Sequence, residues 1–248
     1  MQLAGHKILI TGGSTGIGLA LTRALYQQGN EILICGRDAA RLASAKQEMP
    51  RLHIIQADIA VTNDLKRVVV EAEEQLGGLS LLINNAAIQF NYDFTQADID
   101  TALQNIQYEL QVNLEALMKL SLLCLPLLRQ QASAAIVNLS SGLALTPKKS
   151  AAVYCATKAG VHIFSKALRY QVKDAGLPIM VTEAILPVVE TQMTAGRRKN
   201  KMQPQDVATS ILRGLERDRK EIYVGLVQVF VWLNYAFPWL TARMMRNA

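Results

Sequence analysis

Short apolar runs alternate with longer amphipathic stretches along almost the whole chain. The apolar runs, which predict strands, are residues 7–11, 31–36, 53–57, 79–84, 134–140, 179–185 and 221–225. Helical patterns lie between them; residues 16–29 predict a helix closed by Gly29, and Asp38 is expected to cap the next helix. Strands that are apolar throughout and alternate with helices are typical of parallel sheets covered on both faces. We therefore predict an α/β fold with a single doubly wound parallel sheet (Rossmann-type) and helices on both faces. Ligands of such sheets bind beyond the carboxyl ends of the strands.

The length of 248 residues fits one domain covering residues 1–248. Hydrophobic residues make up 50% and charged residues 19%, which indicates a globular protein rather than a disordered or fibrous one. Cys35, Cys124 and Cys155 are odd in number and lie in apolar surroundings, which favours buried reduced thiols over a disulfide frame. No charged-then-apolar leader precedes "HKILITGG", so a cytoplasmic protein is expected.

The formal net charge of +6 raises the question of nucleic acid. There is no zinc-finger spacing and no basic helix, and only 6% of residues are aromatic. The sequence therefore favours a protein that binds anionic small molecules, with no nucleic acid partner. The three histidines are interpreted as structural, and no metal site is expected. They are His6, His53 and His162.

A glycine-rich turn, "TGGSTGIG", follows the first predicted strand. Glycines let the backbone approach a phosphate closely, and the helix that follows points its free amides at the anion. The spacing differs from G-x-G-x-x-G, so by itself the turn also fits an ordinary strand-to-helix connection. The candidate cofactor-binding residues in it are Gly12, Ser14, Thr15, Gly16, Ile17 and Gly18.

Arg37 stands at the end of the second predicted strand, where a site for NAD usually has an acidic residue that bonds the ribose 2′-hydroxyl. A guanidinium is a planar fork suited to a 2′-phosphate. Arg37 therefore predicts NADP(H) as cofactor, with a surface arginine that pairs with a neighbouring helix as the alternative.

Tyr154 and Lys158 lie four residues apart in "VYCATKAG", a stretch of small residues that predicts a helix. Their side chains are then one turn apart on the same face. Taken alone, this spacing also fits a surface pair.

Four motifs stand in order along the chain: "TGGSTGIG", "NNAA" at 84–87, "SSG" at 140–142 and "YCATK" at 154–158. Together they resemble the short-chain dehydrogenase/reductase family over about residues 5 to 225. Within it, the chain is most similar to bacterial oxidoreductases associated with lipoteichoic-acid D-alanylation genes, whose substrates this resemblance does not define.

The resemblance implies that Tyr154 is the general acid/base and that Lys158 lowers the pKa of its phenol. A free phenol has a pKa near 10, and a neighbouring ammonium favours the phenolate. A shift of ~3 units requires about 4 kcal/mol. The resemblance also assigns Ser141, 13 residues before Tyr154, to the substrate oxygen, and Asn113 to a water-mediated proton relay. Ser140 is expected to bond backbone within its loop.

Further cofactor contacts are implied by the same resemblance. Asp58, with Ile59 beside it, is expected to bond the adenine amino group; Asn85 and Ala86 line the ribose. After the sixth strand the family has Pro-Gly and a threonine three residues later. The matching residues here are Pro187, Val188, Val189 and Thr191. Val188 and Ala87 replace usual glycines and put the local backbone geometry in doubt.

Two C-terminal segments are expected to serve the substrate. Residues 191–204 form a basic loop that is expected to be mobile over the substrate. The loop contains Arg197, Arg198, Lys199 and Lys201, which either bind an anionic substrate or are simply solvated. Residues 226–240 form an apolar stretch, too short to span a membrane, at the start of a C-terminal tail covering 226–248. As an apolar helix it needs burial over the pocket, against a partner subunit or at a membrane surface.

The prediction is thus an NADP(H)-dependent oxidoreductase that moves hydride between nicotinamide and a carbonyl or alcohol. A homo-oligomer, dimer or tetramer, is expected, in the cytoplasm or peripherally at a membrane. Two alternatives remain at this stage: a cofactor-binding regulatory protein with little turnover, and a membrane-associated protein of the same fold.

Overall fold

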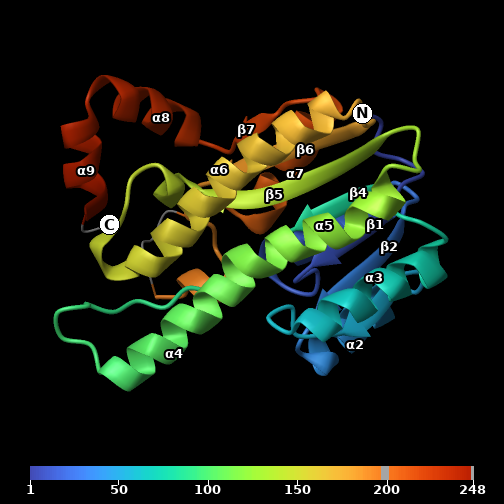
Figure 1. Cartoon of the computed structure of the whole chain (residues 1–248), viewed down its shortest axis with the longest axis horizontal. Helices are drawn as coiled ribbons and strands as arrows, with labels where there is room; N and C mark the ends of the chain where they lie inside the picture. The colour runs from blue at the N-terminus through green and yellow to red at the C-terminus, as the bar shows by residue number, and fades with distance from the viewer. Residues whose placement is uncertain (197–200, 247–248) are drawn as a thin grey trace.

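The computed structural model describes residues 1–196 and 201–246. Its centre is a sheet of seven parallel strands in the order β3-β2-β1-β4-β5-β6-β7 (Figure 1). The strands are β1 (Lys7–Thr11), β2 (Glu31–Gly36), β3 (His53–Gln56), β4 (Leu81–Asn84), β5 (Ala134–Ser141), β6 (Ile179–Leu186) and β7 (Glu221–Tyr223). The strand order reverses between β1 and β4, which is where doubly wound sheets bind their ligands.

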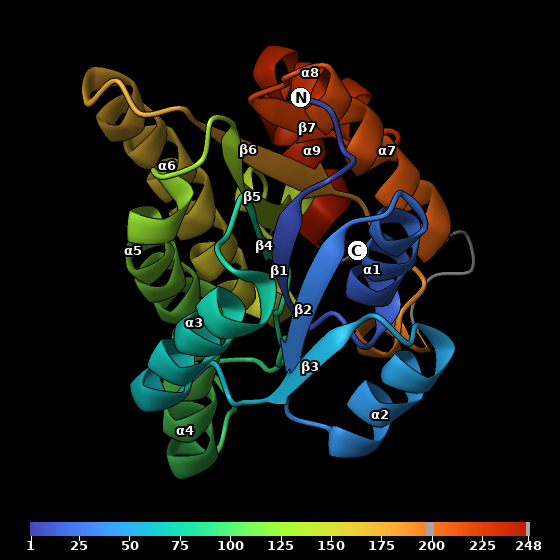
Figure 2. The ribbon, with the colours of Figure 1, turned by 90° about the vertical axis from the view of Figure 1, so that its right-hand side faces the viewer.

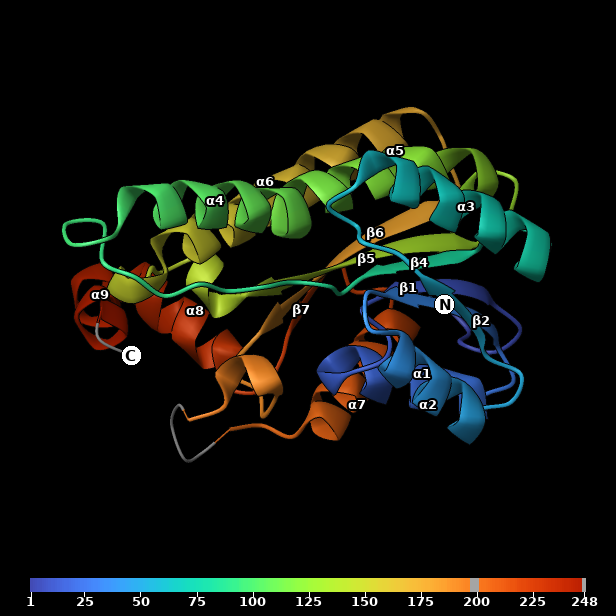
Figure 3. The same ribbon diagram turned by 90° about the horizontal axis from the view of Figure 1, so that it is seen from below.

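Helices cover both faces of this sheet, as Figures 2 and 3 show from two directions. One face carries α1 (Gly16–Gln27), α2 (Ala39–Glu48) and α7 (Pro204–Glu216). The other carries α3 (Thr62–Leu76), α4 (Ile99–Leu110), α5 (Ala116–Leu128) and α6 (Ala152–Asp174). The π-helical turn η1 (Gln111–Glu115) joins α4 to α5. The predicted doubly wound α/β fold is confirmed.

Alternation along β1 shows how the two faces are filled. Ile8 and Ile10 pack into one apolar cluster with α1 and α7, whereas Leu9 packs into a second cluster with α3 and α5. All three side chains are fully buried. Because successive strand residues point to opposite faces, a sheet covered twice needs apolar residues at every position, which is the pattern in the sequence.

The predicted element boundaries hold within two residues. Helix α1 ends at Gln27, and Gly29 follows with a φ of +80°, in the left-handed region that favours glycine. Asp38 caps α2 as expected, accepting a hydrogen bond of 3.1 Å from the amide of Arg41. The three cysteines are free and buried; burial raises the pKa of the Cys35 thiol to about 12 and also raises that of Cys124.

The C-terminal tail is not one continuous helix. It breaks at Phe237 into α8 (Val227–Ala236) and α9 (Pro238–Arg246) (Figure 1). Pro238 has no amide hydrogen and disfavours helical geometry at the preceding residue, so a new helix begins there. Thr241 ties the two helices together by donating to the Asn234 side chain at 2.5 Å.

Within the described residues, the 30-residue helical run Ile99–Leu128 is long and apolar enough to cross a membrane, judged by length and composition only. Its mean hydropathy is 1.3, and 44% of its most apolar window is buried inside the protein. Core helices of soluble proteins pass the same test, so this single helix is weak evidence for a membrane span.

Candidate active site

The backbone of the glycine turn is shaped so that a ligand can approach it closely. Gly12 has a φ of +65° and Gly16 one of +52°, conformations that other residues rarely adopt. A Cβ on Gly18 would lie 2.2 Å from the carbonyl oxygen of Gly12. Asn85 fastens the turn, because its Nδ2 donates to the carbonyl oxygens of Thr11 and Gly12 at 2.8 and 3.2 Å. The start of α1 therefore faces a backbone cradle with room for a phosphate, as a dinucleotide requires.

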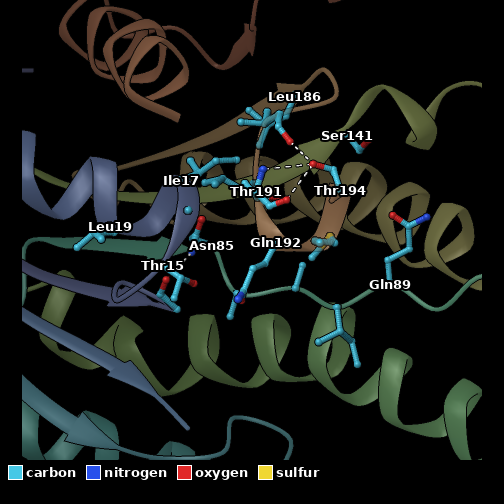
Figure 4. Close-up of a pocket in the computed structure, with 18 of the residues that line it drawn as sticks. Thr15, Ile17, Leu19, Asn85, Gln89, Ser141, Leu186, Thr191, Gln192 and Thr194 are labelled. Carbon is cyan, nitrogen blue, oxygen red and sulfur yellow. Dashed lines mark hydrogen bonds between the residues drawn. The ribbon is translucent and has the colours of Figure 1, made fainter. Parts of the chain in front are cut away.

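A cleft of about 1820 Å³ opens at the carboxyl ends of the strands (Figure 4). It brings most of the predicted site residues together. The residues that line it are Gly12, Ser14, Thr15, Gly16, Ile17, Arg37, Asp58, Ile59, Asn85, Ala86, Ser141, Tyr154, Lys158, Pro187, Val189 and Thr191. Gly18 and Asn113 do not line it: Gly18 packs beneath the turn, and Asn113 is buried to one side.

Tyr154 and Lys158 lie in the first two turns of α6, with Lys158 Nζ 5.6 Å from the centre of the Tyr154 ring. Lys158 is only 3% exposed, and its Nζ donates to the carbonyl oxygen of Leu139 at 2.9 Å. Ser141 ends β5, and its Oγ accepts a 3.2 Å hydrogen bond from the amide of Leu143. Ser141, Tyr154 and Lys158 all line the same cleft.

Ser140 differs from the prediction. Its hydroxyl is buried and donates to the carbonyl oxygen of Lys158 at 3.5 Å, on α6 rather than within its own loop. Because β5 alternates, Ser140 points into the protein when Ser141 points into the cleft.

Two buried carboxyl groups act on Lys158, and sequence reasoning missed both. Burial lowers the pKa of Lys158 to about 8, against the opposing effect of Glu183 and then Glu109, whose charges favour the ammonium. Glu183 is fully buried on β6, and its Oε2 lies 2.7 Å from His162 Nδ1. Glu109 is 0% exposed in α4; burial raises its pKa to about 7. Glu183 lies inside the predicted apolar strand 179–185, a position that could have marked it as buried, whereas nothing in the sequence pattern around Glu109 separates it from an exposed helix residue.

Asn113 lies in the π-helical turn that interrupts the long helix. Its Oδ1 accepts from the amide of Ile88 and its Nδ2 donates to the carbonyl oxygen of Ile88, both at 2.8 Å. Nδ2 also lies 3.3 Å from the Thr157 hydroxyl on α6. The side chain thus holds the loop after β4 against α6, and its relay role stays a prediction.

The end of the cleft that is predicted to hold the adenosine has a contact that the sequence did not predict. Arg37 donates from Nη1 to the hydroxyl of Tyr108, which in turn donates to Asp58 Oδ2 at 3.4 Å. Tyr108 comes from α4, about 50 residues beyond Asp58, so only the folded structure brings it to this place.

Apolar side chains form the wall of the cleft beside Ser141, where α8 packs against the turn that follows β5. They are Leu143, Leu186, Val188, Met193, Leu226, Val227, Phe230, Met244 and Met245. The replacements Ala87 and Val188 both line the cleft without closing it. No group of three or more His, Cys, Asp or Glu residues suited to a metal occurs in residues 1–196 and 201–246.

The loop after β6 is ordered by Thr194, whose hydroxyl donates to the carbonyl oxygen of Val189 at 2.5 Å (Figure 4). Lys201 Nζ donates to the carbonyl oxygen of Thr194 at 2.7 Å and pairs with Glu190 at 3.2 Å. Lys201 is therefore held within the loop rather than simply solvated. Arg197, Arg198 and Lys199 lie outside the described residues.

The sequence profile described as short chain dehydrogenase matches residues 6–202. The chain belongs to the short-chain dehydrogenase family. It is an oxidoreductase with the fold that this family uses to bind a nicotinamide cofactor.

Two relatives are similar to this short-chain dehydrogenase over most of their length. An uncharacterized oxidoreductase of Bacillus subtilis (strain 168), DltE, is 37% identical over 90% of this chain and 89% of its own. The ketoacyl reductase HetN of Nostoc sp. is 30% identical over 90% of this chain and 79% of its own. The similarity to DltE confirms the expected resemblance to bacterial oxidoreductases of this type.

Solved structures of two short-chain dehydrogenases share the fold. One from Burkholderia phymatum, in complex with NAD, has a TM-score of 0.88 at 19% identity over 100% of this chain and 97% of its own. One from Burkholderia cenocepacia, in complex with NADP, has a TM-score of 0.87 at 23% identity over the whole of both chains. Because both cofactors occur among these neighbours, they do not decide between NAD and NADP for this short-chain dehydrogenase.

Proposed function

We propose that the protein is an NADP(H)-dependent reductase of a carbonyl group, which also works in the direction of alcohol oxidation. The observation that supports this most is the convergence of Arg37, Ser141, Tyr154 and Lys158 on one cleft. Arg37 lies at the adenosine end, suited to a 2′-phosphate, and the other three lie at the end where a carbonyl would react.

The protein's own residues divide the work. A nicotinamide cofactor, when bound, would supply or accept the hydride. Tyr154 gives a proton to the carbonyl oxygen in reduction and takes it back in oxidation. Ser141 donates a hydrogen bond to that oxygen, and Lys158 holds the cofactor ribose and favours the phenolate. Asn113 completes the relay that restores the proton.

The apolar wall beside Ser141 suggests what the substrate carries. Burial of apolar substrate surface against Leu143, Leu226 and Phe230 is favourable, at roughly 25 cal/mol per Å². We infer a substrate whose carbonyl group is attached to an apolar chain or ring. Thr194 and Lys201 stabilise the loop that borders this wall.

The outer face of α8 supports a partner for the protein. On α8, Trp232 is 69% exposed and Tyr235 is 87% exposed, and on α9, Trp239 is 66% exposed. Trp232 and Tyr235 lie three residues apart and so share one face of α8, and an exposed apolar helix face is usually covered in solution. We propose that a second subunit of a cytoplasmic homo-oligomer covers it, with peripheral membrane contact as the competing occupant.

The test of the proposed function is turnover with a panel of ketones and aldehydes that differ in the length of their apolar chain, with NADPH and with NADH. Oxidation of NADPH by at least one carbonyl compound, rising with chain length, is the expected result. Tight NADPH binding without turnover of any compound would instead indicate a regulatory protein that keeps the fold.

A further inference from the structure

We propose that Tyr108 is a positioning residue that holds the guanidinium of Arg37 apart from the carboxylate of Asp58, and so keeps Arg37 available to a 2′-phosphate. The inference rests on the proposed preference for NADP(H) and names a residue that maintains it. Tyr108 belongs to none of the motifs of the sequence.

The contacts place Tyr108 between the ends of β2 and β3. Arg37 Nη1 donates to the Tyr108 hydroxyl, and Arg37 Cζ lies 5.5 Å from the centre of the Tyr108 ring. The same hydroxyl donates to Asp58 Oδ2 at 3.4 Å, while Asp58 Oδ1 accepts from the amide of Ala60 at 3.0 Å. Arg37 and Asp58 both line the cleft.

The direction of these hydrogen bonds follows from the chemistry of the groups. A phenol has one proton, and a guanidinium only donates. Tyr108 therefore gives its proton to Asp58 and accepts from Arg37. Burial raises the pKa of Tyr108, against the opposing charge of Arg37, so the group stays a neutral hydroxyl that can donate.

The neighbouring acids are already engaged, which leaves Asp58 as the carboxylate open to Arg37. Asp38 pairs with Arg41 at 3.0 Å. Asp64 pairs with Arg67 at 3.0 Å and accepts from the amide of Asp58 at 2.7 Å. Among the ion pairs of the described residues, none joins Arg37 to Asp58 directly.

Without the hydroxyl, the opposite charges would draw Arg37 and Asp58 together. Arginine and carboxylate form two parallel hydrogen bonds when they meet, and such a pair competes with phosphate for the guanidinium. The backbone of Arg37 would stay in place, since its carbonyl oxygen accepts from Gln56 Nε2 at 2.9 Å. Loss of the hydroxyl would therefore cost NADP(H) its phosphate contact and affect NAD(H) less.

The test is Tyr108→Phe, which keeps the ring and removes only the hydroxyl. Dissociation constants for NADPH and NADH are measured by quenching of protein fluorescence, together with KM and kcat. We expect NADPH to bind about tenfold more weakly, the size of one charge-assisted hydrogen bond, and NADH to change by less than about twofold. The effect is expected in KM for NADPH rather than in kcat. Tyr170→Phe, at an exposed tyrosine on α6, is the matched control.

The double variant Arg37→Ala with Tyr108→Phe separates positioning from a general effect on the fold. We expect Tyr108→Phe to add no further loss of NADPH affinity once Arg37 is gone. Unchanged NADPH binding in Tyr108→Phe, or an equal loss for both cofactors, would overturn the inference. Equal affinity of the parent protein for NADPH and NADH would instead overturn the proposed cofactor preference, which makes the two failures distinguishable.

Discussion

Lys158 donates from Nζ to the carbonyl oxygen of Leu139 at 2.9 Å, across the gap between α6 and the end of β5. The bond directs the ammonium toward the cleft floor, one helical turn from Tyr154. Because Lys158 is buried, its charge depends on Glu183 and Glu109, and this dependence can be measured.

The pH dependence of reduction is expected to report Lys158. Its pKa is lowered to about 8, so the ammonium is present below that pH and is lost above it. We expect kcat/KM to fall above about pH 8, since this parameter reports the free enzyme. Glu183→Gln removes a charge that favours the ammonium, so the fall should begin at lower pH. An unchanged pH profile of Glu183→Gln, relative to the exposed control Glu73→Gln, would contradict this.

Tyr154→Phe should abolish turnover and leave NADPH binding nearly unchanged, because it removes only the hydroxyl that transfers the proton. The expected loss in kcat is about 10²- to 10⁴-fold. Single-turnover kinetics and a cofactor titration measure both quantities. Retention of more than about a tenth of the activity would rule out Tyr154 as the proton-transfer group.

Arg37→Asp should weaken NADPH binding by roughly 2 kcal/mol or more, about 30-fold, because a favourable charge pair is replaced by a repulsion. NADH has no 2′-phosphate and should be much less affected. Titration of both cofactors into the parent and the variant checks this. If the parent binds both cofactors equally, Arg37 does not select NADP(H).

Glu109→Gln should make the stability less dependent on pH. The pKa of Glu109 is raised from 4.5 to about 7, so the folded state keeps a proton that the unfolded state releases. Its contribution to stability is therefore full below pH 4.5 and is lost as the pH rises to 7, in total about 3 kcal/mol. The variant should match the parent near pH 4.5 and exceed it in free energy of unfolding at pH 8. Urea unfolding at both pH values measures this; a difference that is the same at both would contradict it.

The exposed aromatic side chains of α8 and α9 can be tested without disturbing the cleft. Trp232 and Trp239 are exposed and do not line the cleft, whereas Val227 and Phe230 do. We expect Trp232→Ser with Trp239→Ser to shift the solution mass toward smaller species while the protein stays folded. Truncation after Gly225 is a harsher version that also removes the part of the apolar wall formed by Leu226, Val227, Phe230, Met244 and Met245.

Binding to lipid vesicles distinguishes a membrane from a second subunit as the occupant of this face. Sedimentation of the intact protein with anionic liposomes, weakened by the same double substitution, would assign the face to a membrane. An active double variant of unchanged mass, together with no liposome binding by the parent, would defeat both interpretations.

The sequence predicted what depends on local pattern. Apolar runs located every strand, and the glycine turn, Ser141, Tyr154 and Lys158 met at one cleft because parallel strands end at the same edge of the sheet. It did not predict contacts between distant elements. Tyr108 of α4 meets Asp58, just after β3, only in the folded protein, and Glu109 is fully buried although its residue type is usually exposed. The partner of Ser140 likewise depended on the packing of α6.

The cleft draws its two ends from different parts of the chain. The predicted adenosine end is built from Arg37 and Asp58, with Tyr108 added by α4, and much of the apolar wall comes from residues after 185. Substrate choice and the preference between NADP(H) and NAD(H) therefore lie in different parts of the chain. A chimera that exchanges residues 186–248 between relatives should carry the donor's substrate range and keep the recipient's cofactor preference, while Pro187, Val189 and Thr191, which are predicted to contact the cofactor, come from the donor. Substitutions after residue 185 can therefore alter the range of substrates while the residues that are predicted to bind the adenosine phosphate stay unchanged.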